Sequence, residues 1–128
     1  MLVEDDVAFL ESRSWRYEVK LDGQFICLVI YDYPLPTGYV PARADLLLRL
    51  PHGFPDAAPD MFWFHPEVLY ATGGVPPATN DRLDFNGRIW QRWSRHLATA
   101  WRPGIDNLQT YLRLIRTDLA SAVTAMAA

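Results

Sequence analysis

A short segment of the chain carries side chains that could act together on a carbonyl group. Residues 90–96 read Trp-Gln-Arg-Trp-Ser-Arg-His, so a hydroxyl, an imidazole and two guanidinium groups lie close together in sequence. A serine hydroxyl becomes a strong nucleophile when a base removes its proton, and histidine, with an ordinary pKa of about 6.5, is a natural base near neutral pH. Ser94 is therefore a candidate nucleophile, His96 its candidate base, and Arg92 or Arg95 a candidate donor to an acyl oxyanion.

The Ser94 and His96 pairing sets a condition on the backbone. Residues i and i+2 point to different sides of a helix, so the pairing needs extended or looped backbone. The alternative is structural: Ser94 caps a short helix, and His96 packs or forms a hydrogen bond near Trp101. The sequence leaves both interpretations open.

Other reactive groups in the chain favour structural roles. Cys27 is the only cysteine and lies in the apolar run Phe25 to Ile30, with no neighbouring base or cation to lower the pKa of its thiol. We expect it to be buried. One cysteine excludes an internal disulfide, and His52 and His65 lack the spacing of metal ligands, so the sequence predicts neither a metal site nor a cofactor.

A run of basic and aromatic residues predicts a binding surface. Residues 85–103 contain four arginines and three tryptophans but no acidic residue. They are Arg88, Trp90, Arg92, Trp93, Arg95, Trp101 and Arg102. Arginine and tryptophan are typical of interface hot spots, so this set can receive a peptide tail or an acidic partner surface. The alternative is that the arginines lie over the tryptophan rings and simply cover the loop.

Strand signals fill the first half of the chain. A short helix ending near Arg13, with Asp5 or Asp6 as its cap, comes first. A hairpin of residues 15–19 and 25–31 with its turn at Asp22-Gly23 follows, and then strands at residues 44–50 and 61–64. These strands predict a four-stranded antiparallel meander.

The second half predicts a long loop and a helix. Residues 67–86 contain Gly-Gly and Pro-Pro pairs with little periodicity, which predicts a long surface loop. From Ile105 onward, after Pro103-Gly104 and with Asp106 in its first turn, apolar residues recur every three or four positions. These are Leu108, Leu112, Ile115, Leu119 and Val123. A helix covering the apolar face of a meander makes an α+β fold.

Length and charge limit the function classes. With 128 residues the chain has room for one domain, residues 1–128. The net charge of −3 disfavours general binding to nucleic acids or membrane surfaces. No apolar run approaches the roughly 20 residues of a membrane span, and the acidic N-terminus differs from a targeting peptide. We expect a cytoplasmic protein.

Several passages resemble, in order, elements of the ubiquitin-conjugating enzymes. Residues 53–64 look like the family's Tyr-Pro-x-x-Pro-Pro turn with its following strand, and Pro77-Ala78-Thr79-Asn80 looks like its His-Pro-Asn element. Gly87-Arg88-Ile89-Trp90-Gln91 resembles Gly-x-Ile-Cys-Leu, and Trp101-Arg102-Pro103 resembles the tryptophan-proline pair before the covering helix. The resemblance extends over residues 7–119 and points to a divergent prokaryotic branch, encoded beside ubiquitin-like proteins and activating enzymes. Trp90 then stands where the family has its catalytic cysteine.

The resemblance implies a fold and a pathway. It implies the ubiquitin-conjugating fold without the family's two further C-terminal helices. It also implies a bacterial protein that accepts the C-terminus of a ubiquitin-like protein from a ThiF-like activating enzyme, as a Ser94 oxyester, and transfers it to a target lysine. By this resemblance Asn80 orders the site and steadies the oxyanion, although a plain turn role is the alternative.

Two other functions remain open on sequence. One is a cysteine-free binding module that holds a ubiquitin-like protein or assists another conjugating subunit. The other is a nucleic-acid binder that uses the arginines and tryptophans as a stacking and phosphate surface, which the acidic charge of the whole chain disfavours.

Overall fold

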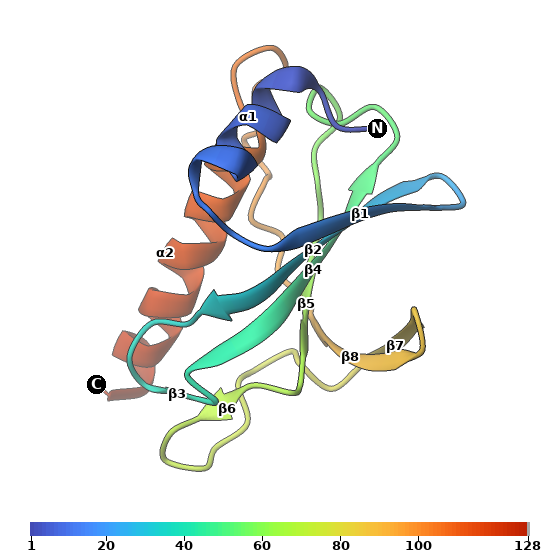
Figure 1. The fold of residues 1–128 in the computed structure, drawn as a ribbon. Coiled ribbons are helices and arrows are strands. Elements are labelled where there is room, and N and C mark those ends of the chain that lie inside the picture. The colour runs from blue at the N-terminus through green and yellow to red at the C-terminus, as the bar shows by residue number, and fades with distance from the viewer. Residues whose placement is uncertain (128) are drawn as a thin grey trace.

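The computed structural model describes residues 1–127, which run from helix α1 (Glu4–Ser12) to helix α2 (Leu108–Ala127). The strands between them are β1 (Tyr17–Asp22), β2 (Phe25–Pro34), β3 (Tyr39–Val40), β4 (Arg43–Pro51), β5 (Phe62–His65), β6 (Leu69–Tyr70), β7 (Arg82–Phe85) and β8 (Arg88–Trp93). Figure 1 shows α2 lying along one side of a twisted sheet, with α1 near the start of α2. The α+β class is confirmed.

The main sheet is antiparallel, with strand order β1-β2-β4-β5-β8-β7. The four predicted strands are therefore neighbours, as a meander requires. Strands β3 and β6 pair separately in a small second sheet. Figure 1 shows the β7–β8 hairpin at the edge of the sheet, curving away from α2.

The prediction of an irregular segment at residues 67–86 is wrong in part, because β6 and β7 lie within it. Strand β7 forms a hairpin with β8 through the two-residue turn Asn86-Gly87, and both turn residues have positive φ, 54° and 77°. An Asn-Gly pair with this backbone is a strong hairpin signal. The Gly-Gly and Pro-Pro pairs upstream concealed it.

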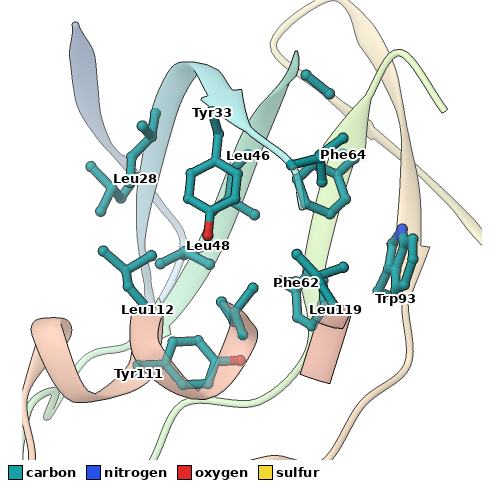
Figure 2. Packing of buried hydrophobic residues seen from close by; sticks show 14 of the residues in the cluster. Leu28, Tyr33, Leu46, Leu48, Phe62, Phe64, Trp93, Tyr111, Leu112 and Leu119 are labelled. Carbon is teal, nitrogen blue, oxygen red and sulfur yellow. The ribbon is translucent and has the colours of Figure 1, made fainter. Parts of the chain in front are cut away.

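The core lies between α2 and the sheet, and Figure 2 shows its packing. Leu28, Leu46, Leu48, Phe62, Phe64 and Trp93 from the sheet pack with Tyr111, Leu112 and Leu119 from α2. Leu108, Leu112, Ile115 and Leu119 are all buried, so the predicted apolar face of this helix is confirmed. Burial of each such side chain stabilises the fold by roughly 1.5–3 kcal/mol.

Helix α2 begins later than its sequence suggests. The prediction of a start at Ile105 is wrong, because Pro103, Gly104 and Ile105 form a turn and the helix begins at Leu108. Asn107 is its N-cap: the Asn107 Oδ1 accepts the Thr110 N–H at 3.1 Å, and the Thr110 Oγ1 accepts the Asn107 N–H at 3.3 Å. These reciprocal bonds satisfy N–H groups that a helix start leaves without partners.

Asp6 caps α2 rather than its own helix. The N-cap of α1 is Val3, which makes no side-chain cap hydrogen bond, so the prediction that Asp5 or Asp6 caps α1 is wrong. Asp6 is only 1% exposed, and its Oδ1 accepts the Leu108 N–H at 3.2 Å. The two helices are thus joined by one carboxylate, whose pKa is raised by its burial.

Candidate functional site

Strand β8 and the residues after it carry the predicted catalytic group. Ser94 directly follows β8, and its backbone N–H donates to the Ala78 carbonyl at 3.0 Å. Its half-buried hydroxyl accepts a hydrogen bond from the Arg92 Nε at 3.0 Å. Side chains two residues apart on a strand share a face, which explains this contact. Residues 94–96 lie in neither helix nor strand, so the looped backbone that the catalytic pairing allows is present.

His96 has a different partner from the predicted one. Its Nδ1 lies 2.9 Å from the Asp60 Oδ1, and both side chains are more than half exposed. The Met61 N–H donates to the Arg95 carbonyl at 3.2 Å, and this bond between chain segments brings Asp60 beside His96. A carboxylate on one ring nitrogen fixes the imidazole orientation and leaves the other nitrogen available. Among the described residues, Ser94 and His96 are not hydrogen-bonded to each other.

Asn80 lies in a segment that runs beside Ser94. The Asp81 carbonyl accepts the Arg92 N–H at 2.9 Å, and the Pro77 carbonyl accepts the Arg95 guanidinium at 2.6 Å. These bonds hold residues 77–81 against the end of β8. Asn80 itself is exposed, so its side chain can reach a molecule bound at this edge.

Trp90 and Trp93 are core residues, and their prediction as partner-binding residues needs correction. Trp90 is 1% exposed, and its indole N–H donates to the Phe85 carbonyl at 3.1 Å. Trp93 is fully buried and stacks on Phe62 with ring centroids 5.6 Å apart. Alternation along β8 sends the two rings to opposite faces of the sheet. Neither ring presents surface to a partner.

Trp101 is half-buried and also has a packing role. Its indole N–H donates to the Pro55 carbonyl at 2.8 Å, and its ring packs near Phe54 and Tyr111. Part of the ring remains at the surface. Trp101 is therefore the one tryptophan of the predicted surface that a partner can contact.

The predicted basic surface is electrically paired, which corrects its expected character. Arg88 bonds to Asp45 at 2.6 Å, Arg95 to Asp118 at 3.0 Å and Arg102 to Asp106 at 3.0 Å, and Arg92 bonds to Asp81. All four acids lie outside residues 85–103: Asp45 on β4, Asp81 in the 77–81 segment, Asp118 on α2, and Asp106 three positions after the range. The sequence window lacked acids, but folding supplies one for each arginine.

Gln91 is a structural residue that the sequence did not single out. It is 2% exposed, its Oε1 accepts the Val68 N–H at 2.8 Å and the Trp93 indole N–H at 3.0 Å, and its Nε2 donates to the Val68 carbonyl at 3.0 Å. Gln91 thus joins the segment after β5 to β8. The signal available in the sequence was an uncharged polar residue between Trp90 and Trp93. Its partner is distant in sequence and was not predictable.

Two shallow hollows border the segment after β8. One, of about 230 Å³, is lined by Ala58, Pro59, Asp60, His96, Ala98 and Thr99. The other, of about 210 Å³, is lined by Leu97, Ala98, Ala100, Trp101, Arg102, Asp106, Thr110 and Leu114. Small and apolar side chains dominate both, and Ala98 lies in each.

The remaining reactive residues are accounted for by packing. Cys27 is 1% exposed in a cluster with Trp63 and Trp90 on the sheet face opposite α2, and burial raises the pKa of its thiol. This confirms its predicted burial. His65 bonds through Nδ1 with the Ile89 carbonyl at 3.0 Å. The described part of the chain holds no group of three or more potential metal ligands and no helix able to span a bilayer.

Comparison with known proteins identifies the class of this chain. The family model described as Prokaryotic E2 family E matches residues 2–122. The chain therefore belongs to this prokaryotic E2-like family, which confirms the resemblance found in the sequence. Membership places it among proteins of ubiquitin-like conjugation, whose general partners are a ubiquitin-like protein and its activating enzyme. No curated protein and no solved structure gave a significant match.

Proposed function

We propose that this chain acts in a bacterial ubiquitin-like conjugation pathway as a binding module that holds a ubiquitin-like protein or a conjugating subunit. The observation that carries the proposal is the burial of Trp90, which stands where the family resemblance expects the catalytic cysteine and is 1% exposed. The one thiol, Cys27, is equally buried. A thioester carrier needs an exposed thiolate, and neither position offers one.

The segment of residues 96–102 is the proposed contact surface. It runs between the two hollows, and exposed groups from His96 and Arg102 flank the half-buried Trp101. An extended C-terminal tail of the ubiquitin-like protein would place small side chains over Ala98. The terminal carboxylate of this tail would lie near His96 and Arg102. The arginine remains bound to Asp106, so contact shape rather than net charge would select the partner.

Substitution of Ala98 tests this surface. Ala98→Arg fills both hollows and should weaken binding of a ubiquitin-like protein at least about tenfold, a loss of about 1.4 kcal/mol. The matched control is Ala71→Arg, which makes the same change on the exposed turn after β6. Titration followed by NMR chemical shifts would measure both. Equal affinities for the two variants would refute the proposed surface.

A serine acyl carrier is a second candidate, favoured by the Asp60–His96 contact near Ser94. In this reaction the Ser94 oxygen attacks the thioester carbonyl on the activating enzyme, the C–O bond forms and the C–S bond breaks. His96 would accept the hydroxyl proton, and the thiolate would leave and later regain a proton. Transfer to a target lysine would then release Ser94.

One reaction separates the two candidates. The chain is mixed with a bacterial ubiquitin-like protein, its activating enzyme and ATP, and intact mass is measured after treatment with a thiol reductant. The binding module predicts a complex but no covalent adduct. The acyl carrier predicts an adduct that survives the reductant, is cleaved by hydroxylamine and is absent in Ser94→Ala. Such an adduct would overturn the first proposal.

A further inference from the structure

A hollow between the two helices combines aromatic rings with unpaired positive charge. It has a volume of about 340 Å³, lies between α1, the end of β2 and α2, and shares no lining residue with the two hollows described above. Its lining residues include the aromatic residues Phe9, Trp15 and Tyr33 and the arginines Arg13, Arg113 and Arg116. Ligand sites of small molecules combine mainly apolar walls with a few polar groups in this manner.

The charge of these arginines is not neutralised within the protein. Arg49, Arg82, Arg88, Arg92, Arg95 and Arg102 each form an ion pair with an aspartate or glutamate. None of the three arginines of the hollow does so among the described residues. In a chain with a net charge of −3, uncompensated positive charge is thus concentrated at one place.

Two of the three guanidinium groups are positioned by neutral partners. The Arg116 Nη1 donates to the Pro34 carbonyl at 2.5 Å, and Arg13 lies over the rings of Phe9 and Trp15, 5.2 Å and 5.9 Å from their centroids. A carbonyl or a ring face orients a guanidinium without cancelling its charge. A ligand anion therefore meets preoriented donors, which lowers the entropy cost of binding.

Acidic groups nearby limit the anion to one side. Asp5 and Asp6 line an adjacent hollow that shares Phe9, Arg13 and Gln109 with this one. Their negative charge favours an anion placed against α2, where Arg113 and Arg116 lie. The aromatic rings of the hollow then face the remainder of the ligand.

We propose that this hollow binds a small organic anion made of a flat ring and a phosphate or carboxylate group. The ring packs against the half-buried side chains of Phe9 and Trp15, whose ring centroids lie 6.2 Å apart. The oxyanion bonds to Arg113 and Arg116, because guanidinium groups match the geometry of both anions. This site is independent of the proposed contact with a ubiquitin-like protein.

Titration with four probes tests the proposal, using the full chain and NMR detection. Adenosine 5′-monophosphate carries a ring and a phosphate, indole-3-acetate a ring and a carboxylate, while adenosine and inorganic phosphate carry one part each. We expect at least one of the two complete probes to bind about tenfold more tightly than either partial probe. The tighter of the two identifies the source of the oxyanion. No saturable binding of either complete probe would overturn the proposal.

Charge-removing variants locate the site. Arg116→Gln keeps an amide donor toward the Pro34 carbonyl. Arg113→Gln removes a charge that forms no ion pair with any residue the structure describes. Each should weaken the complete probe by about tenfold, the equivalent of about 1.4 kcal/mol. The control is Arg16→Gln, which changes the net charge equally but acts on a guanidinium 4.2 Å over the Tyr31 ring. Equal losses in all three variants would indicate general charge attraction and overturn the site. Far-UV circular dichroism would verify that each variant is folded.

Discussion

Removal of the Gln91 side chain should destabilise the fold strongly. In Gln91→Ala, the Val68 N–H, the Val68 carbonyl and the Trp93 indole N–H each lose their partner. A buried polar group without a partner costs roughly 1–3 kcal/mol, so three groups at the lower bound cost about 3 kcal/mol. The space left by the removed methylene groups adds about 1 kcal/mol. We expect the free energy of unfolding to fall by about 4 kcal/mol.

Urea unfolding followed by far-UV circular dichroism would measure this loss. With a urea slope of about 1.5 kcal/mol per molar, the midpoint should fall by about 2 to 3 M. Tryptophan fluorescence is the poorer signal, because the substitution changes the surroundings of Trp93 directly. A loss below about 1 kcal/mol would show that Gln91 does not satisfy these buried groups.

Gln91→Glu is the matched variant. An ionised carboxylate can accept the Val68 N–H and the Trp93 indole N–H, but it cannot donate to the Val68 carbonyl. A protonated carboxyl group can make all three bonds, so the folded state would hold its proton more tightly than the unfolded chain. The stability of this variant relative to wild type should therefore rise as the pH falls toward about 4. A penalty that is the same at pH 4 and pH 7 would contradict the assigned bonds.

Two further substitutions and one labelling experiment have definite expected outcomes. Burial raises the pKa of Asp6, so the charge of this carboxylate reduces folded stability at neutral pH. Asp6→Asn still accepts the Leu108 N–H and should be at least as stable as wild type at pH 7. The difference in stability should shrink as the pH falls through the raised pKa. Hydrogen bonds from Arg102 lower the pKa of Asp106, so Asp106→Asn should be less stable than wild type at neutral pH. This loss of stability should become smaller as the pH falls below the ordinary aspartate range. Unfolding curves from pH 3 to pH 7 would measure both variants. The buried Cys27 thiol, with its raised pKa, should react with a thiol reagent far more slowly in the native protein than in urea, and equal rates would contradict its burial.

The fold was predictable where local pattern and burial agree. The apolar spacing of α2 identified the buried face of that helix, and the β-branched and aromatic run around Cys27 identified the inner strand β2. The start of α2 was predicted too early, because Pro103-Gly104 and Asp106 imitate a helix start. Its true caps are the adjacent Asn107 and the distant Asp6, and pairings over such separations are not visible in sequence.

The candidate site residues could be chosen from the sequence, but their contacts could not. The sequence set extended or looped backbone as a condition for pairing Ser94 with His96 and left a helix cap open; residues 94–96 lie in neither helix nor strand. It did not indicate Asp60, since the bond between Met61 and Arg95 that brings Asp60 beside His96 depends on the pairing of β5 with β8. Trp90 and Trp93 were assigned to a surface because no strand was predicted at residues 88–93, so their alternation along β8 was not recognised.

The pairing of Arg88, Arg92, Arg95 and Arg102 with carboxylates affects how a partner would approach this edge. Opposite charges a few ångströms apart behave as dipoles, whose field decays faster with distance than that of a single charge. A partner would therefore experience little attraction from afar, and its association rate at this edge should depend weakly on ionic strength. Encounter would be governed by diffusion and fit, so selectivity at this edge would arise only once the two surfaces touch.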